Sequence, residues 1–390
     1  MPTPFYVLHR DRVEKNVLDM KRAFESRYKN FAIAYSFKTN YLLPIIEIVA
    51  KHGCMAEVVS PYEMRYAMKT GLFNLDMFVY NGVTPDPVTK FHAAKRGGMV
   101  NVDNYDEYCE IAFEAQREKI PIKLGVRLNF ECSNGLNSRF GIDVLSEDFI
   151  DLMNKIEQNE YITFGGFHCH IGTARPAKYW SEKTIKMIEY AKRYNAQYID
   201  LGGGMYGPMI PELAEQFDEY ALSFDEYADA VCTYMKEAFP EENVKLIVEP
   251  GTALVGNTMD LYCSVTGIKE VRGECYITVN TCSNHLGMIC ECRSIPMHVH
   301  RIHDAKEMTW NVTDATIAGC TCLEFDYIRK NFSGQIAIGD IIVFENVGAY
   351  SISASRQFIV PRPAVLDFDT FNELKRGEDT YDMFVNYLSK

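Results

Sequence analysis

The sequence has no long apolar run. No stretch approaches the roughly eighteen consecutive apolar residues that a membrane-spanning helix needs. The first residues also lack a basic segment followed by an apolar core and a small-residue cleavage site, which is the pattern of a secretory signal. We therefore expect a cytoplasmic protein that does not span a membrane.

Positive charge is in the minority. The chain has 40 Lys and Arg against 53 Asp and Glu, which gives a net charge of -13 at pH 7. This balance argues against a broad attraction to nucleic acid or to anionic lipid. The expected partner is a small molecule.

Internal repeats, low-complexity segments and Pro/Gly/Ser-rich linkers are also missing. The chain has 390 residues, of which 47% are hydrophobic and 24% charged, the balance of a compact protein. That length holds one large α/β domain plus a smaller one, and without a linker the two should share an interface. The 12 cysteines are spread widely, so most are expected to be buried reduced thiols.

Strand-like and helix-like segments alternate over about the first 250 residues. Helical spacing of apolar residues predicts helices at 11–26, capped by Asp11, at 42–52 and at 61–70. A count near eight strand and helix units favours a (β/α)8 barrel, with a doubly wound open sheet as the alternative, because strand order is not written in the sequence. The predicted strands are 5–8, 31–35, 56–59, 78–80, 99–102, 122–128, 164–170, 198–201 and 245–248.

The pattern changes after Gly256, where short strand-like runs follow one another with few helical intervals. We place a domain boundary near Val255, with a barrel over residues 9–255 and an antiparallel β domain over 256–390 together with 1–8. A short helical tail is expected at 369–388. The predicted strands of this domain are 261–268, 274–279, 297–303, 308–312, 341–345 and 357–360.

Lys38 follows an apolar run at residues 31–35, at the carboxyl end of a predicted buried strand. A lysine partly removed from water has a lowered pKa and can attack a carbonyl as a free amine. The alternative is a lysine that extends from the strand end to the surface.

Other chemically capable residues fall at predicted strand ends, where barrels collect their chemistry. They include Arg127, His170, and Glu249 followed by Pro250 and Gly251. Three glycines at 202–204 leave backbone N–H groups bare for a phosphate, although a glycine run also makes tight turns, and a single histidine is often a core residue. Taken together, these groups are the parts needed to hold pyridoxal phosphate (PLP).

Over nearly its whole length the chain resembles the fold-type III PLP-dependent decarboxylases, those of diaminopimelate and ornithine. Each motif is weak alone, and the signal lies in their shared order and similar spacing. The resemblance implies an alanine racemase-like fold, a TIM-like (β/α)8 barrel followed by a β domain. The matching segments are Ala34-Tyr35-Ser36-Phe37-Lys38, Val58-Val59-Ser60 with Glu63, Gly125-Val126-Arg127-Leu128, Ser138-Arg139-Phe140-Gly141, Phe167 through Thr173, Asp200 through Gly204, Glu249-Pro250-Gly251, Cys320-Thr321-Cys322, Gly348-Ala349-Tyr350 and Pro361-Arg362-Pro363-Ala364.

The resemblance also implies a role for each site residue. Lys38 is the Schiff-base lysine, His170 stacks on the cofactor, and Glu249 holds its pyridinium nitrogen. The family brings Cys322 into the neighbouring subunit's site as a candidate acid, which implies a homodimer with shared active sites. The remaining residues implied to bind the cofactor are Arg127, Thr173, Gly203, Gly204, Gly251 and Tyr350.

Glu249 bears on the class of reaction. A carboxylate beside the ring nitrogen keeps it protonated, so the ring can take up the electron pair left when carbon dioxide departs. The related alanine racemases use an arginine there. We therefore expect an amino-acid decarboxylase, with a racemase of the same fold or a PLP-binding homologue without decarboxylase activity as alternatives.

The substrate side departs from the diaminopimelate type. An arginine usually follows Glu-Pro-Gly and an acid usually follows the cysteine, whereas this chain has Thr252 and Leu323, with Glu324 one position later. The segment around Leu323 is similar to the carboxynorspermidine decarboxylases. We expect an amino-acid substrate with a non-standard distal group, and Arg293 as a contact for a substrate carboxylate.

Several cysteines and histidines lie close together in the sequence between residues 282 and 303, and such residues can bind a metal ion. Its spacing is not a standard zinc spacing, and convergence of the side chains depends on the fold. We predict no metal site. The residues considered are Cys282, His285, Cys290, Cys292, His298, His300 and His303.

Overall fold

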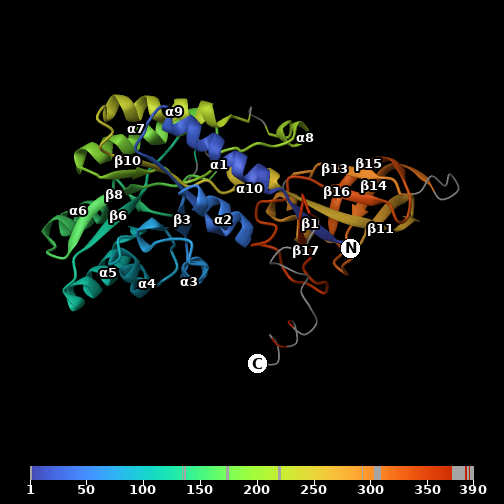
Figure 1. The fold of residues 1–390 in the computed structure, drawn as a ribbon, viewed down its shortest axis with the longest axis horizontal. Helices are drawn as coiled ribbons and strands as arrows, with labels where there is room; N and C mark the ends of the chain where they lie inside the picture. The colour runs from blue at the N-terminus through green and yellow to red at the C-terminus, as the bar shows by residue number, and fades with distance from the viewer. Residues whose placement is uncertain are drawn as a thin grey trace.

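The computed structural model describes residues 2–133, 135, 138–172, 175–217, 221–291, 293–302, 309–370, 383 and 386. It contains two sheets, one parallel and closed, the other largely antiparallel (Figure 1). The predicted helical tail lies mostly outside the described residues, although Met383 and Asn386 are helical.

Eight parallel strands form the closed sheet. Each pairs with its neighbours in the order β5-β4-β3-β2-β10-β9-β8-β6, and pairing between β5 and β6 closes the ring. The prediction of a (β/α)8 barrel is confirmed, and the alternative of an open doubly wound sheet is wrong. The strands are β2 (Phe31–Ser36), β3 (Met55–Val58), β4 (Phe78–Tyr80), β5 (Met99–Val102), β6 (Ile122–Asn129), β8 (Ile162–His168), β9 (Tyr198–Asp200) and β10 (Lys245–Val248), with the short β7 (Ile142–Asp143) beside β6.

Helices cover the outside of the barrel (Figure 1). Ser60, Asn104 and Ser146 each accept a hydrogen bond from a backbone N–H in the first turn of the helix that follows, which stabilises its start. Asp11 is not a cap as predicted, because the first helix begins after His9 and Asp11 lies inside its first turn. The helices are α1 (Arg10–Glu25), α2 (Leu43–Lys51), α3 (Pro61–Thr70), α4 (Pro87–Ala94), α5 (Tyr105–Glu118), α6 (Glu147–Gln158), α7 (Ala177–Arg193), α8 (Pro211–Ala214), α9 (Phe224–Ala238) and α10 (Thr252–Val255).

The second sheet has the order β13-β16-β11-β12-β14-β15 and confirms the C-terminal β domain architecture. The first strand of the chain, β1, pairs with both β11 and β17 in this sheet. Figure 1 shows the blue strand β1 among the orange strands of this domain, from which the chain continues to α1 on the barrel. The strands are β1 (Phe5–Leu8), β11 (Met259–Val271), β12 (Glu274–Val279), β13 (Met297–His300), β14 (Trp310–Ala318), β15 (Tyr327–Ile336), β16 (Ile341–Phe344) and β17 (Ala364–Asp367).

One predicted strand in this half is wrong, and one observed strand was not predicted. Residues 357–360 are not a strand, since Ile359 has φ 52°, which extended backbone does not allow. Strand β15 was not predicted, because its exposed polar residues interrupt the apolar pattern. No helix among the described residues has both the length and the apolar character to cross a membrane.

Candidate active site

Lys38 lies just past the carboxyl end of β2, in the short 3-10 helix η1 (Phe37–Thr39). Its Nζ donates hydrogen bonds to Ser36 Oγ and to Glu57 Oε2, both at 2.7 Å. The side chain is 33% exposed. The amine therefore stands at the barrel mouth, where a small molecule can reach it.

Two carboxylates set the charge of this lysine. Burial disfavours the ammonium form, but Glu57 and Glu249 outweigh it and raise the pKa of Lys38. The expectation of a lowered pKa is therefore wrong, because the fold brings two acids to a lysine that has none beside it in the sequence. Burial raises the pKa of Glu57 to about 7, although Lys38 acts in the opposite direction.

Glu249 follows β10 and is almost fully buried. One carboxylate oxygen accepts a hydrogen bond from Asn81 Nδ2, and the other lies 3.3 Å from His168 Nε2. Burial alone would raise the pKa of Glu249, but His168 and Lys38 lower it to about 2. Glu249 is therefore an anion at neutral pH.

Asp200, at the end of β9, keeps its proton, whereas Glu249 is ionised. Burial and the charge of Glu249 raise the pKa of Asp200 well above its usual range. Its Oδ1 accepts a hydrogen bond from the Gly202 N–H at 2.9 Å, while its Oδ2 meets no hydrogen-bond donor among the described residues. As a neutral acid, Asp200 can donate its proton to Glu249 and so favour the Glu249 anion.

A chain of hydrogen bonds inside the barrel supports Glu249. Tyr198 OH donates to Asn101 Oδ1 at 2.6 Å, and Asn101 Nδ2 donates to Asn81 Oδ1 at 2.7 Å. Gly125 makes room for this chain, because a Cβ there would lie 2.0 Å from Tyr198 OH. Side chains from β5 and β9, and one that follows β4, thus fix the acid that follows β10.

His170 lies against the glycine loop that follows β9. Its Nδ1 accepts a hydrogen bond from the Gly203 N–H at 2.9 Å. Burial and the nearby Lys38 lower the pKa of His170 well below its usual range. The ring is therefore neutral and carries its proton on Nε2.

The glycine loop is more closely packed than the sequence indicates. The N–H groups of Gly202 and Gly203 are not bare as expected, since they donate to Asp200 and His170. No acceptor in the described residues meets the N–H of Gly204, which has φ 98°. Gly204 is therefore the loop residue whose N–H is available to an anion, and the predicted contact Thr173 lies outside the described residues.

Gly251 and Tyr350 complete this side of the site. A Cβ on Gly251 would lie 2.0 Å from Thr39 Oγ1, so only glycine allows this approach to η1. The Tyr350 N–H donates to the Thr39 carbonyl at 2.8 Å, which joins the β domain to the residue after Lys38. Both predicted residues are thus within the neighbourhood of Lys38.

Arg127 occupies a different part of the barrel. Its guanidinium lies 3.4 Å from Asp103 and 4.7 Å from the centre of the Phe140 ring. It also acts on the electrostatics of His168 and His170, so it contributes to the field of the site.

The motif around Cys322 is not brought to Lys38 within this chain. Cys322, Leu323 and Glu324 are exposed and line a surface cavity with Lys269 and Tyr276 of the β domain. Among the described residues, this segment therefore does not reach the barrel site of its own chain.

A cavity of about 460 Å³, which we name the inner cavity, lies next to Tyr350. Tyr350 also contributes to raising the pKa of Lys38, so the cavity and the amine share a neighbour. The predicted substrate contact Arg293 is in its wall. The lining residues are Arg175, Tyr206, Gly207, Pro208, Met209, Leu213, Phe217, Thr252, Gly256, Met288, Ile289, Arg293, Asn346, Ala349 and Tyr350.

The Cys and His residues considered for a metal do not form a described cluster. Cys282 and His285 are buried, and His298 pairs with Glu345 at 2.7 Å. The Cys290 side chain, Cys292 and His303 lie outside the described residues. The described group that could hold a cation is instead His168, Asp200 and Glu249, with one ligand atom of each within 4.8 Å of the others.

Comparison with known proteins decides the family. A model of the pyridoxal-binding domain of pyridoxal-dependent decarboxylases matches residues 10–256. The chain belongs to this family. It is a PLP-dependent amino-acid decarboxylase with the fold of that group.

Individual relatives align with nearly the whole length of this chain. The diaminopimelate decarboxylase of Methanothermobacter thermautotrophicus is 27% identical over 97% of this chain and 92% of its own length. The enzyme of that name from Methanocaldococcus jannaschii is 26% identical over 91% of this chain and 84% of its own. A crystal structure of the M. jannaschii enzyme in complex with L-lysine has a TM-score of 0.84 at 25% identity, covering 99% of this chain and 92% of that one.

The residues of the decarboxylase fit PLP. Lys38 offers a reachable amine, Glu249 offers an anion, and the glycine loop leaves the Gly204 N–H available. A Cβ on Gly203 would lie 2.5 Å from the Glu249 carbonyl oxygen, so a larger residue would displace the loop from the acid.

Sequence reasoning assigned no role to several residues that support this site, although His168 and Asp200 fall within the matching segments. Glu57, His168 and Asp200 lie on three strands and Asn81 follows a fourth, and only closure of the barrel brings them together. A signal was present for Glu57, which is an acid inside the buried strand β3.

Proposed function

We propose that the residues around Lys38 form the PLP site of this decarboxylase. Lys38 bonds covalently to the cofactor, His170 packs on its ring, and Glu249 binds the ring nitrogen. The observation that best supports this proposal is the Glu249 anion, which His168, Asn81 and Asp200 hold in place. Arg127, Thr173, Gly203, Gly204, Gly251 and Tyr350 complete the proposed cofactor contacts.

Bound there, PLP supplies an electron-accepting ring for the carbon that loses carbon dioxide. The chain's own residues hold that ring in the charged state. Glu249 remains an anion because Asp200 keeps its proton, and the neutral His170 adds no opposing charge on the ring face. This charge pattern favours decarboxylation.

We propose that the active enzyme is a homodimer with shared sites. Cys322 is exposed on the β domain and is not near Lys38 in the described residues of the same chain. A second subunit is a source from which this thiol can reach the site and return a proton to the product. The division into a barrel over residues 9–255 and a β domain over 256–390 with 1–8 is part of this proposal.

The substrate proposal concerns the distal group. The named relatives are diaminopimelate decarboxylases, and one was crystallised with L-lysine. This chain has Thr252 in the inner cavity and an exposed Leu323 after the cysteine, neither of which can balance a distal charge. We therefore propose an amino acid whose distal group differs from that of meso-diaminopimelate.

We also propose a cytoplasmic location. The described cysteines are free thiols, and Cys54, Cys169 and Cys263 are buried without a disulfide partner. Such thiols persist in a reducing compartment.

Replacing the proposed covalent lysine tests the function. Lys38→Ala should lose the absorption of the lysine-linked cofactor and release carbon dioxide at least about a thousandfold more slowly, because the covalent step is lost. Lys186→Ala removes an exposed lysine of α7 and should behave as the wild type. Retention of both the linkage and the rate by Lys38→Ala would contradict the proposal.

A substrate comparison tests the distal group. We expect meso-diaminopimelate to be turned over about tenfold or more slower than L-2-aminopimelate, which lacks only the distal amine, because desolvating an unpaired ammonium is unfavourable. Carbon dioxide release measures both rates. An equal or faster rate with meso-diaminopimelate would show that the standard substrate is accepted.

A further inference from the structure

Lys183 is a buried lysine beside the proposed site. It lies on α7 and is 0% exposed. Its Nζ donates a hydrogen bond to the Leu201 carbonyl at 2.8 Å and lies 3.1 Å from the centre of the Trp180 ring, one turn earlier on the same helix. A cation and an aromatic face attract each other. The ammonium group is therefore held against the residue that precedes the glycine loop.

Buried cations are normally paired with acids, and Lys90 of this chain is an example. Lys90 is also 0% exposed, and its Nζ donates to a carboxylate oxygen of Glu107. Lys183 forms no ion pair with an acid among the described residues, and its hydrogen bond is to a neutral carbonyl. The positive charge of Lys183 is therefore not balanced by a carboxylate in contact with it.

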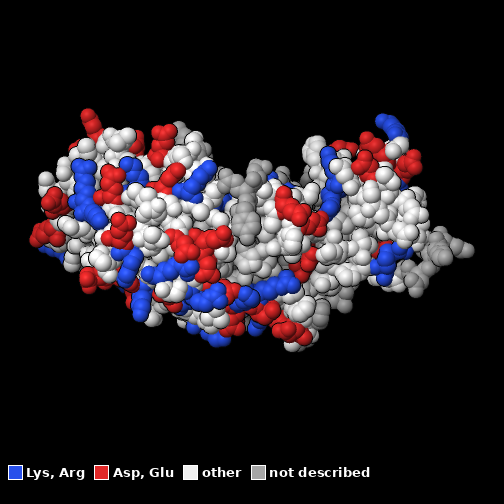
Figure 2. All heavy atoms as spheres, turned by 90° about the horizontal axis from the view of Figure 1, so that it is seen from above, with Lys and Arg blue, Asp and Glu red and all other residues white. Residues whose placement is uncertain are grey.

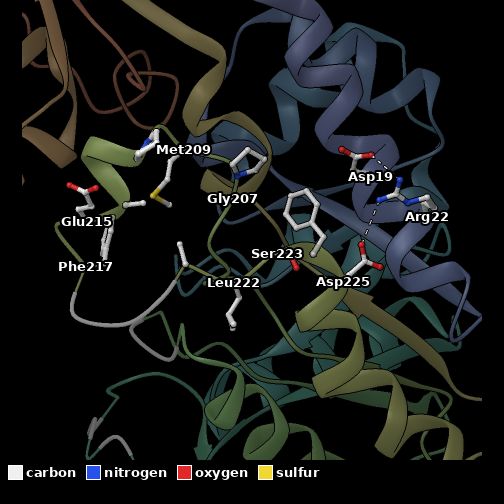
Figure 3. A pocket seen from close by; sticks show the side chains of 14 residues that line it. Asp19, Arg22, Gly207, Met209, Glu215, Phe217, Leu222, Ser223 and Asp225 are labelled. Atoms are coloured by element: carbon white, nitrogen blue, oxygen red, sulfur yellow. Dashed lines mark ion pairs between the residues drawn. The ribbon is translucent and has the colours of Figure 1, made fainter.

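A surface cavity of about 710 Å³ gives a second contrast, since its wall carries charges of both signs (Figure 3). There Arg22 lies 3.6 Å from both Asp19 and Asp225. Arg22 thus has acids beside it although its side chain is exposed. Lys183, out of reach of solvent, has no acid in contact in the described part of the chain.

The carbonyl that Lys183 holds belongs to the first peptide of the glycine loop. That peptide joins Leu201 to Gly202, and its N–H donates to Asp200 Oδ1 at 2.9 Å. The next carbonyl, that of Gly202, accepts a hydrogen bond from the Glu249 N–H at 2.8 Å. Because hydrogen bonds in series polarise one another, an ammonium group on the carbonyl strengthens the N–H on the other side of the same peptide. Lys183 thus fixes the start of the loop from the helix side.

Four titratable groups at the ends of barrel strands act on Lys183. Burial lowers the pKa of Lys183 to about 8, while Cys169, Cys132, Asp200 and Glu249 act in the opposite direction. Burial raises the pKa of both cysteines, that of Cys169 to about 12, and Asp200 keeps its proton. Glu249 is therefore the one of the four that is charged at neutral pH. Since Glu249 is the proposed ring-binding acid, the field of Lys183 extends into the site.

The helices around Lys183 add two further titratable groups. Tyr227 of α9 packs edge-on against Trp180 with ring centres 5.5 Å apart, and burial raises the pKa of Tyr227. Glu182, next to Lys183 on α7, accepts hydrogen bonds from the N–H and the hydroxyl of Ser133. Lys183 is therefore the cation of this buried cluster, and its charge changes at a pH slightly above neutral.

We propose that Lys183 is a positioning residue for the phosphate of PLP, which fixes the glycine loop through the Leu201 carbonyl and adds a positive charge on the helix side of that loop. This inference rests on the proposed function, in which Gly204 contacts the cofactor. The Gly204 N–H meets no acceptor among the described residues, so the loop ends with a donor suited to an anion. A phosphate there would be attracted by a buried ammonium group that no carboxylate in contact neutralises.

Binding of two ligands to the full-length, cofactor-free chain separates the phosphate from the ring. Pyridoxamine 5′-phosphate and pyridoxamine share the ring, cannot form an imine with Lys38, and differ only in the phosphate. Calorimetry gives the ratio of their affinities, which we name the phosphate preference. The phosphate preference of the wild type should fall about fivefold from about pH 7 to about pH 9, as Lys183 loses its proton. Lys183→Met should have an about tenfold lower phosphate preference at pH 7, and it should show no such fall.

Two further variants separate the charge from its surroundings. Lys183→Gln keeps an N–H donor for the Leu201 carbonyl but removes the charge, so it should also have a lower phosphate preference that does not fall with pH. Lys192→Met is the matched control, because Lys192 is an exposed lysine of α7 whose Nζ lies 5.8 Å from the centre of the Phe239 ring. It should behave as the wild type. Circular dichroism establishes that each variant is folded, and if neither Lys183 variant folds, the pH dependence of the wild type carries the test.

The outcomes are distinct. A wild-type phosphate preference that is the same at both pH values would overturn the proposal. So would equal weakening of both ligands in Lys183→Met, because the lysine would then act on the ring through Asp200 and Glu249.

Glu249→Gln tests the proposed cofactor site separately and should weaken both ligands, because both carry the ring. If it weakens neither, the proposed cofactor site fails. If it weakens both while the Lys183 variants retain the wild-type phosphate preference, only the role of Lys183 fails.

Discussion

Two buried carboxylates at neighbouring strand ends carry opposite charge states. The pKa of Glu249 is lowered to about 2 by His168 and Lys38 despite burial, whereas burial and Glu249 raise that of Asp200. Such divergence assigns different roles to chemically similar groups. Glu249 is the anion at neutral pH, and Asp200 is a positioning residue that holds a proton.

Replacing Glu249 by glutamine should change the acid dependence of stability. The folded pKa of Glu249 lies below its unfolded value of 4.5, so its contribution is present above pH 4.5 and is lost as the pH falls towards 2. Between these values the wild type should lose about 1.4 kcal/mol per pH unit that Glu249→Gln does not lose.

Urea unfolding of the cofactor-free protein between pH 5 and pH 3 measures this difference. Glu241→Gln, at an exposed residue before β10, is the control and should retain the wild-type slope. Equal slopes for the wild type and Glu249→Gln would contradict the charge assignment.

The sequence indicated candidate reactive groups but not their surroundings. Lys38, His170 and Glu249 could be proposed as site residues because each lies at the end of a recognisable strand, and barrel chemistry lies at strand ends. The raised pKa of Lys38 could not be found, because Glu57 is 19 residues away and reaches it only through β2 and β3 pairing.

At the scale of elements, close backbone approach dominates the loop after β9. Gly203 lies so near the end of β10 that a Cβ would come within 2.5 Å of the Glu249 carbonyl oxygen. The Gly203 N–H also holds His170. One loop thus sets the distance between the proposed ring-stacking histidine and the proposed ring-binding acid.

Gly203→Ala should therefore separate these two residues. We expect about 1–3 kcal/mol lower free energy of unfolding from overpacking, and weaker PLP binding. Urea unfolding and a cofactor titration measure the two effects.

Gly267→Ala provides the comparison, because a Cβ at Gly267 in β11 would meet its nearest atom at an ordinary 3.9 Å. It should leave PLP binding unchanged. Wild-type PLP affinity in Gly203→Ala would show that the loop can relax without affecting the site.

Element prediction succeeded where periodicity was strong and failed where polar residues broke it. The predicted bounds of α3 and β10 agree with the structure, since each has a clear apolar pattern. The β domain was less accurate, because β15 carries several exposed residues and the run before Pro361 contains the left-handed Ile359. Turn geometry of this kind is not visible in hydrophobicity alone.

At the scale of the molecule, acidic and basic residues are interspersed over the face shown in Figure 2. The net charge of -13 is therefore spread rather than gathered over one part of that face.

Mixing two inactive variants should restore activity if sites are shared between subunits. Lys38→Ala and Cys322→Ala each damage a different component, and a mixed dimer retains one site with both components intact. Random exchange of subunits should recover about a quarter of wild-type carbon dioxide release. Mixing each variant with itself is the control, and no recovery in exchanged dimers would exclude a shared site of this composition.

The pairing of β1 has a consequence for synthesis on the ribosome. This strand precedes both of its neighbours in the chain, and β11 and β17 are made only after the strands of the barrel. Chains fold progressively from the amino terminus as they are synthesised. The barrel can therefore assemble before residues 5–8 have a strand to pair with, so this segment joins its sheet late although it is made early.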